Sequence, residues 1–233
     1  MPSGATEPQE TAAVIRLEAL SPLDADARAA LASAVQRPRT HRARREMIAE
    51  GQDIAETLLV LSGWAARVRL LEDGRRQILA FLLPGDLIGY CDQERPVASS
   101  SVIAVTEVDV CTAPDASVSP ALARAYRQSR AREQAHLFSQ ITRLGRLNAH
   151  ERIADFLLEL LERLELAGLA AHGRYVMPLT QELMADALGL TSVHVNRTLQ
   201  ALRREGSLNW KGRELILPDP SAYGAPPGGR RSG

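Results

Sequence analysis

The chain of 233 residues is 45% hydrophobic and 24% charged, and its 28 basic side chains balance its 28 acidic ones. This composition excludes a disordered polymer, and no apolar run approaches the roughly 18 residues that a membrane span needs. Two cysteines are too few for a disulfide framework or a closed zinc site, and the first residues lack a secretory signal, so we expect a cytoplasmic protein with neither metal nor cofactor.

The N-terminal half of the chain predicts a short helical segment followed by many short strands. We expect a disordered tail over residues 1–13 and then helical spacing, in which Ser21 can cap a helix. The β-prone runs that follow are separated by turn dipeptides, and Asp73-Gly74 between two of them predicts a hairpin. Strands at this spacing predict a β-roll, which we assign to a sensor domain over residues 14–120.

One long helix is expected over residues 121–148. Its apolar side chains Tyr126, Leu137, Ile141 and Leu144 lie near one stripe. Helices of this length with a narrow apolar seam often pair with a copy of themselves, so we expect a homodimer joined through these four residues. The alternative is that the seam packs only on the chain's own roll.

The segment 149–218 has the spacing of a helix-turn-helix with a wing. Thr180 and Thr191 stand where two helices would begin, and their hydroxyls can cap those helices. Gly189 falls between the helices, where a left-handed backbone turns the chain sharply. The run NWKGREL then predicts the tight turn of a β-wing, and the Gly- and Pro-rich residues 219–233 predict a disordered tail. By periodicity alone, a helical hairpin inside a core explains the two helices equally well.

Local charge favours nucleic acid over a core hairpin. Between residues 191 and 213 the only acid is Glu205, whereas the segment carries three arginines before the single lysine of the chain, Lys211, and one after it. Such a local positive potential attracts a polyanion, and in a helix-turn-helix the N-terminal end of the second helix enters the major groove. We expect base contacts from Ser192, Val193, Asn196 and Arg197. We expect contacts to the DNA backbone from Thr180, Thr191, His194, Arg203, Arg204, Lys211 and Arg213.

This segment resembles the winged helix of the Crp/Fnr family of bacterial transcription regulators. The run RLNAHERIADFLLEL resembles the family's hinge and first DNA-domain helix, and LLVLSGWAARV, RRQILAFLLPGDLIGY and VDVCTAP resemble its cyclic-nucleotide-binding-type β-roll. The resemblance covers about residues 15 to 218. It implies an α+β fold with an N-terminal β-roll, a long dimerisation helix and a C-terminal winged helix-turn-helix. It also implies a homodimer on a two-fold-symmetric operator in double-stranded DNA, with RNA polymerase as a further partner.

The recognition helix departs from the family pattern at one position. Arg197 matches the family's arginine, which can make a bidentate pair with guanine O6 and N7. Val193 stands where a glutamate often precedes that arginine by one turn. A glutamate accepts from cytosine N4, whereas valine offers only apolar contact, for example with a thymine methyl. The family's usual half-site is therefore in question at this base.

The roll departs from the members that bind cyclic nucleotide. Tyr90-Cys91 stands where the ribose-binding glutamate would be, and the residues near the phosphate position include no arginine, unless Arg95 substitutes. An unpaired phosphate in a buried site is costly, so cAMP binding is not expected. The loop length resembles the Fnr-like and FixK-like branches, whose rolls do not bind nucleotide. The candidate effector pocket consists of Gly85, Asp86, Tyr90, Arg95, Ser99 and Ser100, for an effector that the sequence does not identify.

Two further functions stay open at this point. One is a signalling module that binds a small ligand in the roll and acts through protein contacts. The other is a redox or haem sensor that uses the cysteines or Pro2, although the four cysteines of iron–sulfur Fnr proteins are missing and Cys111 matches only one of them. An enzyme is not expected, because no nucleophile elbow or histidine–carboxylate pair is present. The sequence leaves activation versus repression undecided.

Overall fold

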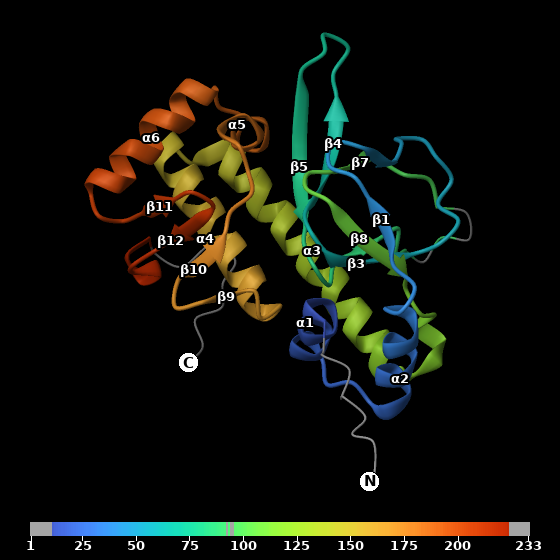
Figure 1. Cartoon of the computed structure of the whole chain (residues 1–233). Helices are drawn as coiled ribbons and strands as arrows, with labels where there is room; N and C mark the ends of the chain where they lie inside the picture. The colour runs from blue at the N-terminus through green and yellow to red at the C-terminus, as the bar shows by residue number, and fades with distance from the viewer. Residues whose placement is uncertain (1–10, 92, 94–95, 224–233) are drawn as a thin grey trace.

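The computed structural model describes residues 11–91, 93 and 96–223, and within these ranges no helix is long and apolar enough to cross a membrane. Figure 1 shows two units joined by one long helix, α3 (Pro120–Arg146), with a β-roll along its first half and a winged helix at its end. The helix begins where expected because Ser119 caps it, accepting a hydrogen bond from the Leu122 amide, and Pro120 occupies its first turn.

The roll consists of two four-stranded antiparallel sheets with the strand orders β1-β8-β3-β6 and β2-β7-β4-β5. Aliphatic side chains such as Val60, Ala104 and Val110 fill the space between the sheets. The predicted hairpin is confirmed: Gly74 has φ 85° in the turn between β4 and β5. The strands are β1 (Arg39–His41), β2 (Glu46–Ile48), β3 (Leu58–Ser62), β4 (Ala65–Leu70), β5 (Arg76–Leu82), β6 (Leu87–Ile88), β7 (Ser101–Ala104) and β8 (Val108–Thr112).

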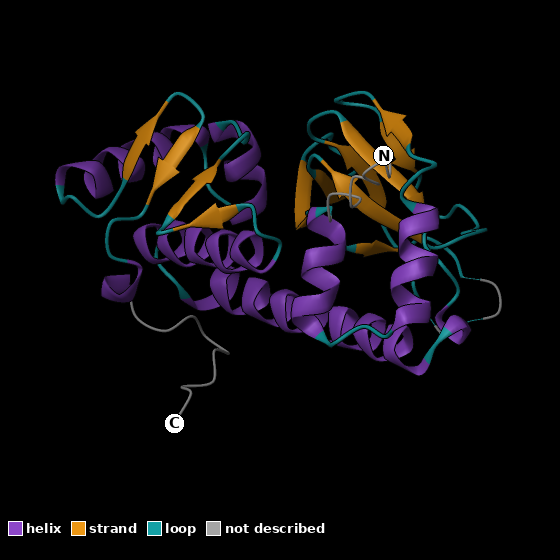
Figure 2. Cartoon of the chain, turned by 60° about the horizontal axis from the view of Figure 1, so that its bottom comes forward, coloured by secondary structure: helices purple, strands orange, loops and turns teal. Residues whose placement is uncertain are grey.

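Two short helices, α1 (Ala12–Leu20) and α2 (Ala25–Ala34), precede the roll and pack beside α3 (Figure 2). The expected tail over 1–13 was therefore too long, because α1 begins inside it and Ala13 is fully buried. Residues 1–10 lie outside the described part of the chain. Ser21 does not begin a helix as expected but is the C-cap of α1, where its amide donates to the Leu17 carbonyl. Asp24 caps α2 instead, since its carboxylate accepts a hydrogen bond from the Ala27 amide.

The two halves of α3 have different surroundings. Tyr126 is 1% exposed within its own protomer, where its hydroxyl donates to the Pro114 carbonyl and its ring packs against Tyr90. Its assignment to a dimer interface was wrong, because η1 (Ala116–Val118), α1 and the roll already cover that part of the helix. Further along α3, Leu137 and Ile141 are 36% and 67% exposed, and Phe138, which the sequence reasoning missed, is 60% exposed.

The C-terminal unit places three helices on a small sheet of strand order β11-β12-β10-β9. An asparagine capping box, Asn148 with Glu151, begins α4. The expected tail from 219 was wrong at its start, because η2 (Pro220–Tyr223) contacts α4, while residues 224–233 are not described. The elements are α4 (Ala149–Leu166), β9 (Ala170–Ala171), β10 (Arg174–Val176), α5 (Gln181–Leu188), α6 (Ser192–Arg204), β11 (Asn209–Lys211) and β12 (Glu214–Ile216).

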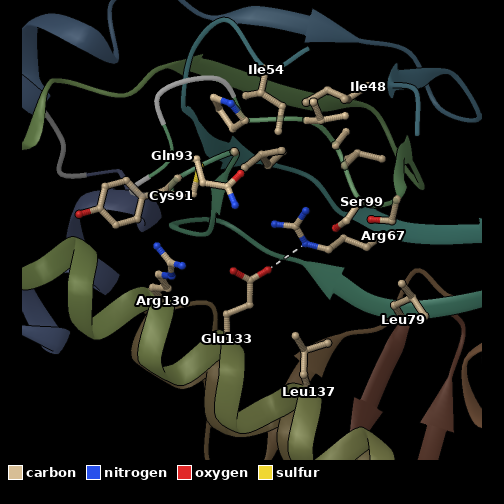
Figure 3. Close-up of a pocket in the computed structure, with 18 of the residues that line it drawn as sticks. Ile48, Ile54, Arg67, Leu79, Cys91, Gln93, Ser99, Arg130, Glu133 and Leu137 are labelled. Carbon is tan, nitrogen blue, oxygen red and sulfur yellow. Dashed lines mark hydrogen bonds and ion pairs between the residues drawn. The ribbon is translucent and has the colours of Figure 1, made fainter. Parts of the chain in front are cut away.

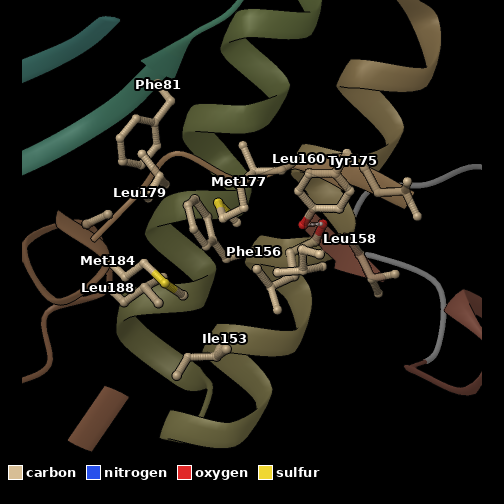
Figure 4. Packing of buried hydrophobic residues seen from close by; sticks show 14 of the residues in the cluster. Phe81, Ile153, Phe156, Leu158, Leu160, Tyr175, Met177, Leu179, Met184 and Leu188 are labelled. Atoms are coloured by element: carbon tan, nitrogen blue, oxygen red, sulfur yellow. Dashed lines mark hydrogen bonds between the residues drawn. The ribbon is translucent and has the colours of Figure 1, made fainter. Parts of the chain in front are cut away.

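The two units share one hydrophobic core. Figure 4 shows Phe81 of β5 directed toward Phe156 of α4, and the two ring centroids lie 5.7 Å apart. Met184 and Leu188 of α5 belong to the same buried cluster. Because this cluster is continuous, the winged helix is held against the roll through the contact of α5 with β5, and α4 also contacts α3.

Candidate nucleic-acid interface

The turn between α5 and α6 has the geometry that the sequence predicted. Gly189 has φ 62°, a left-handed conformation that glycine adopts without a steric penalty, and its amide donates to the Ala185 carbonyl. Thr180 caps α5 by accepting from the Leu183 amide, and Thr191 caps α6 by accepting from the His194 amide. Both caps fix where the helices begin, and therefore which residues stand at the first turn of α6.

Helix α6 buries one face and presents the other. Val195 and Leu199 are 0% and 2% exposed and pack into the core of the unit. On the opposite side, Val193 is 74% exposed, and Arg197 is also exposed. Since side chains three or four residues apart share a helix face, Val193 and Arg197 lie next to each other on the surface. The structure thus brings these predicted base-reading residues together, with Ser192 and His194 exposed beside them.

Asn196 differs from its exposed neighbours because its amide is already bonded within the protein. It is half-buried, its Nδ2 donates to Gln181 Oε1 at 3.0 Å, and its Oδ1 accepts from Gln200 Nε2 at 2.9 Å. The sequence reasoning missed both glutamines. The i, i+4 spacing of Asn196 and Gln200 was a usable signal for one bond, whereas the contact with Gln181 depends on how α5 meets α6.

A groove of about 260 Å³ separates α6 from the wing. Arg203 spans part of it by donating to the Trp210 carbonyl at 3.1 Å, and the Trp210 indole donates to the Gly212 carbonyl at 3.1 Å. Lys211 and Arg213 are exposed at the tip of the wing. The groove is lined by Leu179, Thr180, Gln181, Asn196, Leu199, Gln200, Arg203, Trp210 and Gly212.

The charge of this surface suits a phosphate backbone. The first turn of α6 contains no acid, and the partial positive charge at a helix N-terminus favours anions. Arg203 and Arg204 occupy the last turn. Glu205 lies beyond the helix and contacts His150 of α4 at 3.0 Å, away from the first turn of α6. The first turn of α6 therefore adds no negative charge beside Val193 and Arg197 that would repel DNA.

Comparison with known proteins identifies the family to which the two domains belong. A model of the Crp-like helix-turn-helix domain matches residues 151–222, and a model of the cyclic nucleotide-binding domain matches residues 38–125. The nitrogen fixation regulation protein FixK of Bradyrhizobium diazoefficiens is 35% identical over 188 residues, which are 78% of this chain and 79% of that protein. The chain belongs to the Crp/Fnr family. It is therefore a DNA-binding transcription regulator and not an enzyme, and proteins of this family act as dimers.

Other relatives place the regulator near the same branch of the Crp/Fnr family. The transcriptional activator protein FnrL of Cereibacter sphaeroides is 29% identical over 188 residues, or 77% of this chain and 75% of that protein. The solved structure of FixK2 from Bradyrhizobium japonicum is 31% identical, superposes with a TM-score of 0.69, and covers 80% of this chain and 94% of that chain. The fold class and family resemblance predicted from the sequence are thereby confirmed.

The second candidate site of this Crp/Fnr regulator is a cavity of about 510 Å³ between the roll and α3 (Figure 3). Tyr90, Ser99 and Ser100 line it as expected. An ion pair between Arg67 of β4 and Glu133 of α3, 2.8 Å long, occupies one side of the cavity.

Two of the other three expected pocket residues, Asp86 and Gly85, do not line this cavity. Asp86 was assigned wrongly, because it is buried and its carboxylate pairs with Arg16 and Arg163 instead. The assignment of Gly85 to the pocket was also wrong, because Gly85 packs directly against the Arg16 side chain. Arg95 lies outside the described residues.

The two cysteines have different surroundings. Cys111 is buried in the cluster beneath α3, and this burial raises the pKa of its thiol, so the reactive thiolate is disfavoured. Cys91 is half-buried and lines the cavity between the roll and α3. Apolar packing accounts for Cys111.

Proposed function

We propose that the dimer binds an operator of two inverted half-sites whose centres lie about one helical turn, ~34 Å, apart, with one α6 in the major groove of each. The observation that carries this proposal is the exposed first half of α6. Arg197 stands there on the face opposite the buried Val195, on a helix whose start is fixed by the Thr191 cap.

Each exposed residue then has a specific role. Arg197 pairs with a guanine, Val193 makes apolar contact with a thymine methyl, and Ser192 reaches a base edge or a phosphate. The Asn196 amide already bonds Gln181 and Gln200. It contacts a base with the N–H donor and the oxygen lone pair that these two bonds leave unused. The residues assigned to phosphates are Thr180, Thr191, His194, Arg203, Arg204, Lys211 and Arg213.

The second half of α3 supplies the contact between protomers. Leu137, Phe138 and Ile141 are large apolar side chains that are exposed on one helix, four or fewer residues apart. Pairing this seam with its copy removes the apolar surface from water. Leu144 is half-buried and lies beside Gly189, so it supports the winged helix as well.

The roll does not bind cAMP under this proposal. Arg67 is the arginine of the described roll that lines the cavity, and Glu133 already pairs with it. A cyclic phosphate entering the cavity would have to displace that carboxylate or lie beside it, and like charges in a partly buried site repel. The regulator then acts in the cytoplasm on the chromosome and meets RNA polymerase there.

Selection of DNA from a random pool by the full-length protein tests this function, followed by binding of two variants to the selected duplex. We expect Arg197→Ala to lose about 1–3 kcal/mol of discrimination against a wrong base pair in each half-site. We expect Arg204→Ala to weaken binding to selected and random DNA equally, with a smaller salt dependence. Equal loss of preference in both variants would contradict this division, and selection of sequences without two-fold symmetry would contradict the operator.

A further inference from the structure

A series of buried charges begins at the boundary between the roll and the C-terminal unit. Arg16 of α1 pairs with Asp86 at 2.7 Å, and the second oxygen of Asp86 pairs with Arg163 of α4 at 2.7 Å. Arg163 also donates to the Phe81 carbonyl of β5 at 2.7 Å. One carboxylate of the roll thus joins the N-terminal helix to the first helix of the DNA-binding unit.

The series continues along α4 to α3. Glu159 contacts Arg163 at 3.3 Å and Arg143 of α3 at 2.6 Å. Arg143 in turn pairs with Asp155 at 2.7 Å. Along this series positive and negative side chains alternate, and their charges balance. We refer to the six residues as the buried charge row: Arg16, Asp86, Arg163, Glu159, Arg143 and Asp155.

The row lies in the interior and not on the surface. The side chains of Arg16, Arg163 and Arg143 are 2%, 6% and 2% exposed. Burial alone would raise the pKa of Asp86, but the charges of Arg16 and Arg163 outweigh it and hold that pKa below its ordinary value. The pKa of Glu159 is also below its ordinary value, because the charges of Arg143 and Arg163 outweigh the effect of burial. Both carboxylates are therefore ionised at neutral pH.

Stability alone does not account for the row. Among the described residues, Nε of Arg16 and Nε of Arg163 are buried without a hydrogen-bond partner. Buried ion pairs can often be replaced by apolar side chains of similar volume at no loss of stability. What an ion pair offers beyond an apolar contact is direction, because a guanidinium and a carboxylate pair in few geometries. The row is thus suited to fixing an orientation.

The orientation in question is that of α4 on α3. Helix α3 ends at Arg146 and α4 begins at Ala149, so a two-residue link, Leu147 and Asn148, joins them. Links of about two to five residues between antiparallel helices adopt a few characteristic conformations, and contacts beyond the link decide which of them is adopted. Figure 1 shows α4 running back beside α3, with the strands of the roll on the other side. The row restrains α4 from α1, from the roll and from α3 at once.

We propose that the buried charge row positions the recognition helix, so that Asp86 and Glu159 set the spacing between half-sites that the dimer accepts. This inference rests on the proposed binding of two half-sites. Helix α3 carries the seam between protomers, and α4 carries the unit that contains α6. The angle between α3 and α4 therefore determines the distance from one α6 to its copy. None of the six residues has to touch DNA for this effect.

The test compares two glutamates on α4. Glu159→Gln keeps the size of a row residue and removes its charge. Glu162→Gln is the matched control, because Glu162 also pairs with an arginine of α3, Arg132, at 3.0 Å, but with side chains 48% and 41% exposed. Each full-length protein is titrated against duplexes with two selected half-sites at the preferred spacing, with one base pair added or removed, and against a single half-site.

We expect the wild-type protein and Glu162→Gln to prefer the selected spacing equally. Glu159→Gln should lose about tenfold of that preference, equivalent to about 1.4 kcal/mol, while its affinity for a single half-site stays the same. A purely structural role would lower the active fraction of the protein and weaken binding to every duplex alike. Such a uniform loss, or an unchanged spacing preference, overturns the proposal.

A second variant keeps the test decisive if Glu159→Gln does not fold. The combination Arg16→Met and Asp86→Leu replaces one pair of opposite charges with apolar side chains, and the remaining Arg163, Glu159, Arg143 and Asp155 stay balanced in charge. We expect a folded dimer, checked by circular dichroism and mass, with the same loss of spacing preference. A folded dimer with wild-type preference, or an unfolded chain, counts against the proposal. Failure of the wild type to bind paired half-sites would instead refute the proposed function.

Discussion

The exposed cations of α6 and the wing use charge in the opposite way to the buried charge row. The cations of α6 and the wing are exposed and outnumber the acids around them, so their field reaches into solvent, where a polyanion can approach. The row is buried and balanced, so its charges act on one another and on the groups packed against them. Arginine is therefore available to a polyanion at one place and paired with carboxylates at the other, and burial makes the difference.

The energetic consequence of this difference can be measured on the row itself. In Asp86→Ala, Arg16 and Arg163 would remain buried and lose their shared partner. We expect a loss of about 3–5 kcal/mol in the free energy of unfolding, because a buried charge is left uncompensated. Urea denaturation at one fixed protein concentration measures it, since the stability of a dimer depends on concentration.

An exposed ion pair of the roll provides the comparison. Glu50 contacts Arg69 at 3.3 Å with side chains 45% and 54% exposed. Glu50→Ala should cost no more than about 1 kcal/mol, because water screens a surface pair. A loss for Asp86→Ala as small as this would show that the row contributes no more than a surface pair does.

The expected base contact of residue 193 on the exposed face of α6 can be tested by introducing a carboxylate there. Val193→Glu places an acceptor one turn before Arg197. We expect a gain of about 1–3 kcal/mol in preference for cytosine at the facing base, because glutamate accepts from cytosine N4. Competition among four duplexes that differ at that base pair measures the change. Val193→Ala, which adds no acceptor, serves as the control, and a cytosine preference in both variants would refute the assignment.

The smallest expected effect concerns His136, which lies beside the row, 3.9 Å from Glu159. Burial, aided by Arg163, lowers the pKa of His136 from 6.5 to about 4. The unfolded chain therefore binds this proton more readily than the folded one, and stability falls as the pH drops from 6.5 toward 4.

We expect His136→Gln to remove about 1–2 kcal/mol of the stability difference between about pH 7 and about pH 5. Unfolding by urea at both pH values measures it. His194→Gln, on the exposed face of α6, is the control and should leave the difference as in the wild type. The acid sensitivity that remains would come from carboxylates with lowered pKa values, such as Asp86 and Glu159.

The local signals in the sequence predicted the local structure well. The Thr180 and Thr191 caps, the left-handed Gly189 and the Asp73-Gly74 hairpin are confirmed, because each depends on residues at most a few positions apart. The exposed face of α6 followed in the same way from the spacing of its apolar residues. Family resemblance supplied the order of the domains, and the comparisons confirmed it.

Contacts between distant residues were beyond the sequence. Asp86 looked like a pocket residue, but its partners Arg16 and Arg163 are 70 and 77 positions away. Tyr126 fitted the apolar stripe of a dimer helix, yet α1 and the roll cover it. The periodicity of apolar residues shows which side chains share a helix face. It does not show which element of the fold will pack against that face. The sequence by itself determined the two helices of the helix-turn-helix, the turn between them and the exposed face of α6. Only the tertiary structure decided which charges are buried, because burial depends on where segments far apart in the chain meet.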